Sequence, residues 1–257
     1  MPKSGLLRRP NASSVLTNNP EMFEGTRLIL RGRKTARRTD VEEIAILRKR
    51  ISAGDAVFDV GANKGGYLAS LARMVGRRGR VFAFEPLPEL AARLVTACAR
   101  LRWRQVEVCS AAVSDQDGTA VLATPAGDRH WESSLEGNAS PGARTREVPT
   151  VRLDNYLDQL EGRPLTAMKI DVEGHESAVI AGGSELITRN KPMLLVEVEA
   201  QHRPDRDPGV FFAQMDDLGY RGWFLREGVR QEVDAFEVGR DQAGNGQHVN
   251  NFVFEPI

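Results

Sequence analysis

Glycines and one carboxylate stand together in residues 57–67, which read VFDVGANKGGY. The apolar start of this segment is typical of a buried strand. A strand that runs through glycines into a helix presents backbone N–H groups and a helix N-terminus to a ligand. Glycines also let a ligand approach the backbone closely. We therefore predict that Asp59, Gly61, Asn63 and Gly65 bind a cofactor.

Glu85 ends the next apolar run, 24 residues after Gly61. A carboxylate at this place can accept hydrogen bonds from both hydroxyls of a ribose. A dinucleotide site would need a glycine where Asn63 stands, and Asp59 suits an ammonium better than a pyrophosphate. S-Adenosylmethionine has a ribose and an ammonium but no phosphate, so these residues favour it over NAD. An NAD-dependent oxidoreductase remains an alternative.

Ser114 and Asp115 follow the third apolar run. In a sheet of this kind the end of the third strand passes the adenine, so either side chain could reach N6 of the base. Residues 115–118 read DQDG, which also fits a turn that Asp115 opens. Both interpretations stay open.

Asp171 and His175 lie in the segment MKIDVEGHE, residues 168–176, where a further apolar run ends. Transfer of a methyl group to oxygen needs an acceptor hydroxyl that is aligned and loses its proton. A histidine with a pKa near neutrality suits the role of base. We predict His175 as the base and Asp171 as its support, while a purely structural histidine stays open.

Glu197 and Glu199 follow on the next run and point to the same side of a strand. Either one, together with Asp171, could hold a Mg²⁺ ion that acidifies a bound hydroxyl. Alternatively, Glu199 faces solvent and Glu197 binds substrate or cofactor directly. No N-P-P-Y segment follows Asp171 and neither cysteine lies near it, so oxygen is the expected methyl acceptor.

Short apolar runs alternate with stretches of helical length, which predicts a doubly wound α/β fold. Its sheet is mainly parallel, with helices on both faces. The expected strands are residues 56–60, 80–84, 106–109, 167–170, 193–198 and 251–254. The expected helices are residues 65–75, 88–101, 153–160, 176–188 and 208–218, besides one that begins after Asp40 and ends before Gly54.

The N-terminal segment is basic, since residues 1–50 hold 12 Lys and Arg against five acids. Residues 1–39 predict an irregular arm, and with the helix after Asp40 they form a unit of residues 1–50. Residues 51–257 form the expected cofactor-binding domain. Within it, the polar segment 124–147 is a candidate lid. The basic arm could bind nucleic acid or an anionic ligand, or be a solvated surface.

The composition is that of a globular protein, with 41% hydrophobic and 27% charged residues in 257. No stretch approaches the about 18 apolar residues of a membrane span, and the start lacks an apolar signal region. We therefore expect a cytoplasmic protein. Two cysteines, Cys98 and Cys109, exclude a disulfide framework and a zinc ribbon.

The chain resembles the FkbM-type S-adenosylmethionine-dependent methyltransferases in eight segments, which occur here in the same order as in that family. They are VFDVGANKGGY (57–67), GRVFAFEP (79–86), AAVSDQDG (111–118), SSL (133–135), VPTVRLDNYL (148–157), MKIDVEGHE (168–176), LLVEVE (194–199) and NFVFEP (251–256). The resemblance implies a class I methyltransferase (Rossmann-like) fold with a seven-stranded sheet. It implies Asp59, Gly61 and Glu85 as cofactor residues and residues 171–175 as the reacting edge.

The resemblance also implies O-methylation of a hydroxyl on a sugar or on a glycosylated or secondary metabolite. The expected partner is therefore a glycan or small-molecule acceptor, and a homodimer is open. A second hypothesis is a nucleic-acid methyltransferase guided by the basic arm, against which the acidic balance of residues 51–257 stands. A third is a non-catalytic binding module on the same fold.

Overall fold

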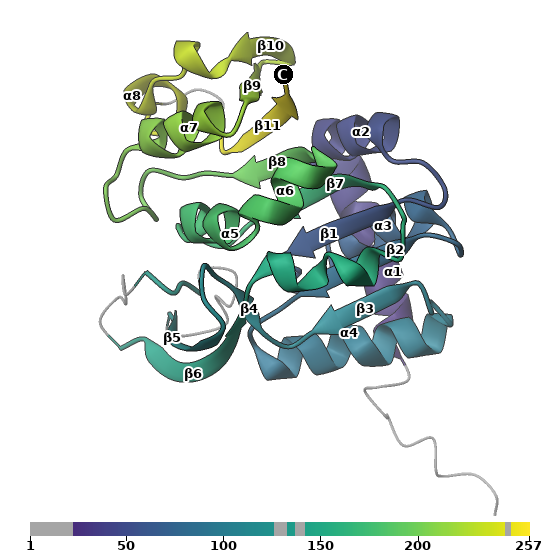
Figure 1. Cartoon of the computed structure of the whole chain (residues 1–257). Helices are drawn as coiled ribbons and strands as arrows, with labels where there is room; N and C mark the ends of the chain where they lie inside the picture. Colours follow the sequence, from purple (N-terminus) through teal and green to yellow (C-terminus); the bar gives the residue numbers. More distant parts are fainter. Residues whose placement is uncertain (1–22, 126–132, 137–141, 245–247) are drawn as a thin grey trace, which may run out of the picture.

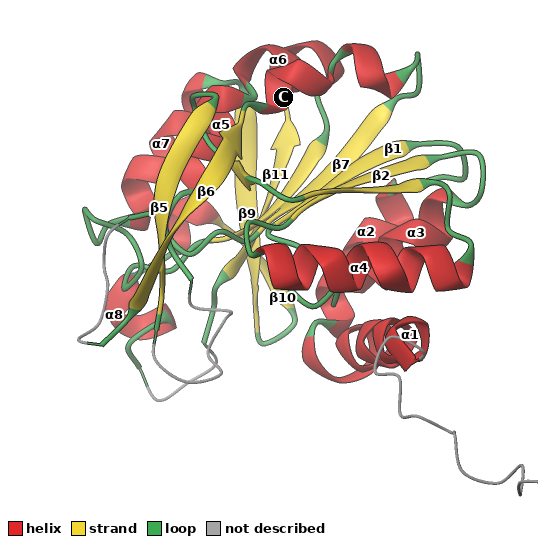
Figure 2. Cartoon of the chain, turned by 90° about the horizontal axis from the view of Figure 1, so that it is seen from below, coloured by secondary structure: helices red, strands yellow, loops and turns green. Residues whose placement is uncertain are grey.

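The structure is a computed structural model that describes residues 23–125, 133–136, 142–244 and 248–257. Its centre is an eight-stranded sheet in the order β10-β9-β11-β8-β7-β1-β2-β3. Figure 1 shows the strands in this order, and Figure 2 shows α5, α6 and α7 on one face of the sheet and α2, α3 and α4 on the other. Within the described residues, no helix is long and apolar enough to cross a membrane.

Five neighbouring strands are parallel, which confirms the doubly wound fold: β1 (Ala56–Val60), β2 (Arg80–Phe84), β3 (Val106–Cys109), β7 (Leu165–Ile170) and β8 (Met193–Glu197). Parallel strands place their carboxyl ends at one edge of a sheet, and ligands bind there. The residues that follow β1, β2 and β7 are Gly61, Glu85 and Asp171. The fold therefore gathers these residues at one edge.

The sheet has eight strands, whereas the family resemblance implies seven. Strands β11 (Asn251–Pro256), β9 (Tyr220–Arg226) and β10 (Val229–Glu232) pair antiparallel. The extra edge strand, β10, arises from a hairpin whose two-residue loop, Glu227 and Gly228, has positive φ at both positions. Such loops match the twist of the flanking strands. The hairpin has no recognisable sequence signal, because glutamate rarely occupies that loop position.

Three further strands form a second sheet in the order β4-β6-β5: β4 (Ala112–Val113), β5 (Gly118–Thr124) and β6 (Arg144–Val151). The candidate lid, residues 124–147, overlaps these strands at both ends, since β5 ends at Thr124 and β6 begins at Arg144. Ser134 pairs with Ala123 of β5 as an isolated bridge. Residues 126–132 and 137–141 of the predicted lid lie outside the described residues.

The N-terminal segment is helical where the sequence predicted an irregular arm. Helix α1 (Glu24–Lys34) continues through a π-helical turn, η2 (Thr35–Thr39), into α2 (Val41–Arg50). Leu28 of α1 is 1% exposed, and an added Cβ at Gly32 would lie 2.4 Å from Ala69 Cβ. α1 thus packs closely on the domain through a glycine, a signal that apolar periodicity does not carry. Residues 1–22 lie outside the described residues.

The remaining helices follow the prediction with local changes. α4 (Pro88–Leu101) and α7 (Pro208–Asp217) have nearly the expected bounds, and α3 (Leu68–Val75) begins after the glycine turn. The expected helix over 176–188 is interrupted at Gly183 and becomes α5 (Glu176–Gly182) and α6 (Ser184–Asn190). Residues 153–160 form two short 3-10 helices, η4 (Leu153–Tyr156) and η5 (Asp158–Leu160), and η6 (Val233–Ala235) and α8 (Val238–Asp241) were not expected.

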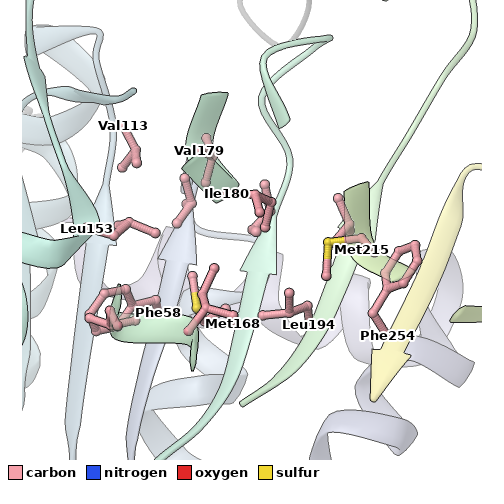
Figure 3. Close-up of a cluster of buried hydrophobic side chains, with 14 of the residues drawn as sticks. Phe58, Val113, Leu153, Met168, Val179, Ile180, Leu194, Met215 and Phe254 are labelled. Atoms are coloured by element: carbon pink, nitrogen blue, oxygen red, sulfur yellow. The ribbon is translucent and has the colours of Figure 1, made fainter. Parts of the chain in front are cut away.

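Two apolar cores lie on the two faces of the sheet. Phe58, Met168 and Leu194 face Val179 and Ile180 of α5, as Figure 3 shows. Val57 belongs to the opposite core, with Leu28 and Leu68. Because side chains alternate along a strand, Asp59 shares the face of Val57 and is directed towards the N-terminal helices.

Candidate active site

Two cavities meet at the carboxyl edge of the parallel strands. The first cavity lies towards β2, β4 and β5, and Glu85, Ala112, Leu135 and His175 line it. The second cavity lies towards α1, η2 and the glycine turn. Gly61, Asn63 and Asp171 line both cavities. A single elongated ligand can therefore span them.

Glu85 is buried beside the glycine turn. Its two carboxylate oxygens accept hydrogen bonds from the backbone N–H groups of Asn63 (2.7 Å) and Leu87 (2.8 Å). Burial raises the pKa of Glu85 to about 7, against the effect of these two donors. The hydrogen bonds fix the orientation of the carboxylate, and each oxygen keeps a lone pair for a ligand hydroxyl.

Asp59 is 2% exposed, and its Oδ2 has no hydrogen-bond partner among the described residues. Burial raises its pKa to about 7, while the nearby charge of Lys169 acts in the opposite direction. A buried carboxylate without a partner is costly unless a ligand compensates it. Since Asp59 lines the second cavity, a cationic group of a ligand would be stabilised there.

Three residues of the glycine turn have positive φ: Gly61, Asn63 and Gly65. Gly61 has a φ of +83°, and a Cβ at this position would lie 1.8 Å from the carbonyl oxygen of Asp171. Asn63 has a φ of 47°, and its buried Oδ1 has no partner among the described residues. Gly65 lines neither cavity; a Cβ there would lie 2.3 Å from Leu28 Cδ1. Gly65 thus makes room for α1 rather than for a ligand.

His175 lies at the start of α5, and each of its two ring nitrogens lies within hydrogen-bond distance of another side chain. Nε2 lies 2.9 Å from Ser114 Oγ, and Nδ1 lies 2.6 Å from Glu136 Oε1. Ser114 Oγ also lies 3.1 Å from Asp115 Oδ1, so its single hydrogen can be donated either to Asp115 or to Nε2. Glu136 was not predicted as a site residue, because it lies in the polar segment 124–147, where no motif or periodicity distinguishes it. Asp115 itself is exposed and lines neither cavity.

Asp117 connects the DQDG turn to the segment that follows β6. Asp117 Oδ1 accepts hydrogen bonds from the backbone N–H of Arg152 (3.0 Å) and from Asn155 Nδ2 (2.8 Å). These hydrogen bonds lower the pKa of Asp117. The two interpretations of Asp115, a turn residue or an adenine contact, both stay predictions.

The loop after β7 is held by a contact with His202, which follows β8. Glu173 has a φ of 54°, and its Oε2 lies 2.6 Å from His202 Nδ1. That contact raises the pKa of His202 to about 9, and burial raises the pKa of Glu173. Glu176 is 1% exposed and accepts a hydrogen bond from the backbone N–H of Gly174 (2.9 Å). Glu173 and Glu176 lie in the segment MKIDVEGHE and His202 lies three residues after LLVEVE, but no role was predicted for them from the sequence.

Asn250 Nδ2 donates hydrogen bonds to both Glu197 (2.8 Å) and Glu199 (3.2 Å). The two carboxylates therefore lie on the same side of the chain, as predicted. Glu199 is 9% exposed, so the alternative in which it faces solvent is wrong. Glu197 also lies 3.8 Å from Lys169 Nζ. The described part of the chain has no group of three His, Cys, Asp or Glu side chains that could hold a metal ion.

A doubly wound sheet with such a turn, an acidic residue after β2 and two joined cavities is typical of class I S-adenosylmethionine-dependent methyltransferases. Residues 59–222 match the model of the methyltransferase FkbM domain. The chain therefore belongs to the FkbM methyltransferase family.

Two curated relatives are methyltransferases. The chain is 30% identical over 151 residues to the 2-O-methyltransferase NoeI of Sinorhizobium fredii, a match to 52% of this chain and 60% of NoeI. It is 26% identical over 172 residues to the hexuronic acid methyltransferase AglP of Haloferax volcanii, a match to 63% of this chain and 64% of AglP. The chain thus spans less than two thirds of the length of either relative.

Two solved structures share the fold. One is a protein of Clostridium thermocellum described provisionally as an rRNA methylase, with a TM-score of 0.52, 15% identity and coverage of 84% of this chain and 94% of that one. The other is a Streptococcus mutans methyltransferase in complex with SAH, with a TM-score of 0.50, 9% identity and coverage of 86% and 99%. At such identities the likeness concerns the fold alone.

Proposed function

We propose that this chain is an S-adenosylmethionine-dependent O-methyltransferase whose acceptor is a hydroxyl of a sugar or of a glycosylated or secondary metabolite. The observation that carries the proposal is the pair of cavities joined at Gly61, Asn63 and Asp171. The first cavity is lined by Glu85, a carboxylate suited to ribose hydroxyls, and the second by Asp59, a buried carboxylate whose Oδ2 has no partner among the described residues. S-Adenosylmethionine has a ribose and an ammonium at corresponding ends.

The residues present fit this cofactor. Glu85 would accept hydrogen bonds from the ribose, and Asp59 would bind the ammonium. Ala112 and Leu135 line the first cavity and offer an apolar surface to the adenine. When bound, the cofactor supplies an electrophilic methyl group.

The proposed base is His175. Glu136 holds the N–H on Nδ1, and this leaves Nε2 as the nitrogen that can accept a proton. Ser114 now contacts Nε2, so the acceptor hydroxyl must take its place. Asp171, at the junction of the cavities, would orient the acceptor.

A carbohydrate acceptor draws support from the relatives, one described as a 2-O-methyltransferase and the other as a hexuronic acid methyltransferase. Mg²⁺ has no part in the proposal, because the residues suggested for it do not fit. Glu197 and Glu199 are engaged by Asn250, Lys169 and His248 rather than gathered around Asp171.

Transfer of label from methyl-tritiated S-adenosylmethionine into a host extract tests the function. The extract is then separated into glycan, small-molecule and nucleic-acid fractions, with and without a chelator. We expect label in the glycan or small-molecule fraction, unchanged by the chelator. Label only in nucleic acid would overturn the proposal, and loss of label with the chelator would restore the metal hypothesis.

A further inference from the structure

Charged groups of both signs line the second cavity. The cations are Arg31 and Lys34 of α1, Lys64 of the glycine turn and Lys169 of β7, and the carboxylates are Asp40, Asp59 and Asp171. Asp59 is buried and its Oδ2 has no partner among the described residues. The cavity is therefore suited to a small group that carries a positive and a negative charge close together.

The position of Arg31 follows from close packing between α1 and the glycine turn. Arg31 Nη1 donates to the backbone carbonyl of Lys64 over 3.2 Å, which holds the guanidinium at the rim of the cavity. Partial burial lowers the pKa of Arg31. Glycines allow this approach, since an added Cβ at Gly32 would meet Ala69 and one at Gly66 would lie 3.0 Å from Thr35 Oγ1.

The turn of η2 borders the same cavity, because Thr35 and Thr39 also line it. Single π-helical turns within helices are frequent at functional sites. Here the turn carries the chain from α1, with its cations, to Asp40 at the start of α2.

We propose that Arg31 and Lys34 bind the carboxylate at the amino-acid end of S-adenosylmethionine, while Asp59 binds its ammonium. This inference rests on the proposed function. The carboxylate and ammonium of an amino acid share one carbon atom, so a site for both needs opposite charges within one cavity, as observed. A guanidinium also matches the geometry of a carboxylate. Arg31 and Lys34 lie outside the matched residues 59–222, so the N-terminal helix adds this part of the site.

A carboxylate on the acceptor, such as that of a uronic acid, has the same chemistry and could contact the same cations. The two sources are separated by ligands that contain no acceptor. S-Adenosylhomocysteine keeps the amino-acid end, whereas 5′-methylthioadenosine has the adenosine and the thioether but lacks the amino-acid end.

The test is calorimetric titration of both ligands into the full chain and its variants Arg31→Ala and Lys34→Ala. We expect each variant to weaken S-adenosylhomocysteine binding by about tenfold or more, the scale of a lost charged hydrogen bond. Binding of 5′-methylthioadenosine should change by less than about twofold, within the scatter of neutral surface substitutions. Arg33→Ala, an exposed cation of the same helix that does not line the cavity, is the matched control.

Unchanged S-adenosylhomocysteine affinity in both variants would overturn the inference, as an acceptor carboxylate would then be the remaining source. An equal loss for both ligands would also overturn it, since the substitution would have disturbed the adenosine end. Lys34 is exposed, so its replacement keeps the test valid if Arg31→Ala fails to fold. Wild-type protein that binds neither ligand would overturn the proposed function itself.

Discussion

Nε2 of His175 lies 2.9 Å from the hydroxyl oxygen of Ser114, although the two residues are 61 positions apart in the chain. His175 is proposed as the base, and Ser114 is predicted to contact the adenine. Because the two side chains contact each other, His175 can accept a proton from a substrate only when this contact is broken. Glu136 on the other ring nitrogen holds the imidazole in place.

Replacing His175 with alanine tests whether this residue is the base or only positions the cofactor. If His175 is the base, turnover falls by roughly 10²–10⁴, the usual contribution of a general base, while S-adenosylhomocysteine affinity is kept. Steady-state kinetics and calorimetry on the same preparation measure both quantities. His248→Ala, which removes a histidine outside the joined cavities, is the control. Normal turnover with weakened cofactor binding would make His175 a positioning residue instead.

Glu85→Ala should weaken S-adenosylhomocysteine binding by more than about 1 kcal/mol, because a charged acceptor for the ribose is lost. The matched control is Glu89→Ala on α4, an exposed carboxylate that pairs with Arg146 over 2.6 Å. Titration of both variants gives the comparison. Wild-type affinity in Glu85→Ala would remove this carboxylate from the cofactor site.

Stability of the ligand-free protein should depend on pH through Asp59. Burial raises its pKa to about 7, so the folded state binds a proton that the unfolded state releases at lower pH. The stabilisation from this proton is complete below the unfolded pKa and is lost as the pH rises through about 7. Asp59→Asn should therefore gain stability relative to wild type as the pH rises from about 4 to about 7, the interval between the unfolded and folded pKa values. Thermal melts across this interval measure the gain; a constant difference would contradict the assignment.

Cofactor binding should have the opposite pH dependence, because an ammonium prefers ionised Asp59. S-Adenosylhomocysteine affinity is expected to rise towards pH 8, by up to about tenfold per pH unit below the pKa for one linked proton. Asp59→Asn should bind weakly and with less dependence on pH. Equal pH profiles in the two proteins would show that Asp59 does not titrate with the ligand.

Gly61→Ala should destabilise the fold more than alanine at another glycine of positive φ. The new Cβ would lie 1.8 Å from Asp171 O, and the backbone must move. At Gly162, with a φ of +74°, a Cβ would meet nothing within 4 Å, so only the strain of the left-handed conformation remains. We expect a difference of at least about 2 kcal/mol in chemical denaturation. Similar losses in both variants would show that the turn adapts to the side chain.

Some of this architecture could be predicted because its signals are local. The strands of residues 56–60, 80–84 and 106–109 and the helix of residues 88–101 have the predicted bounds, since apolar runs and periodicity report burial directly. The β9–β10 hairpin and α1 were missed for the opposite reason. Their signals are a glutamate in a tight turn and glycines at a helix contact, and these acquire meaning only next to a partner.

By itself, the sequence determined the family, the doubly wound fold and the sheet edge that carries Asp59, Gly61, Glu85 and Asp171. Gly61, Glu85 and Asp171 directly follow strands and Asp59 is the last residue but one of β1, and the parallel order brings these strand ends together. Only the tertiary structure decided which side chains meet there. Glu136 contacts His175, Asn250 donates to both Glu197 and Glu199, and Arg31 and Asp59 line the same cavity. These contacts join distant segments, and pairings of that kind follow from packing rather than from local pattern.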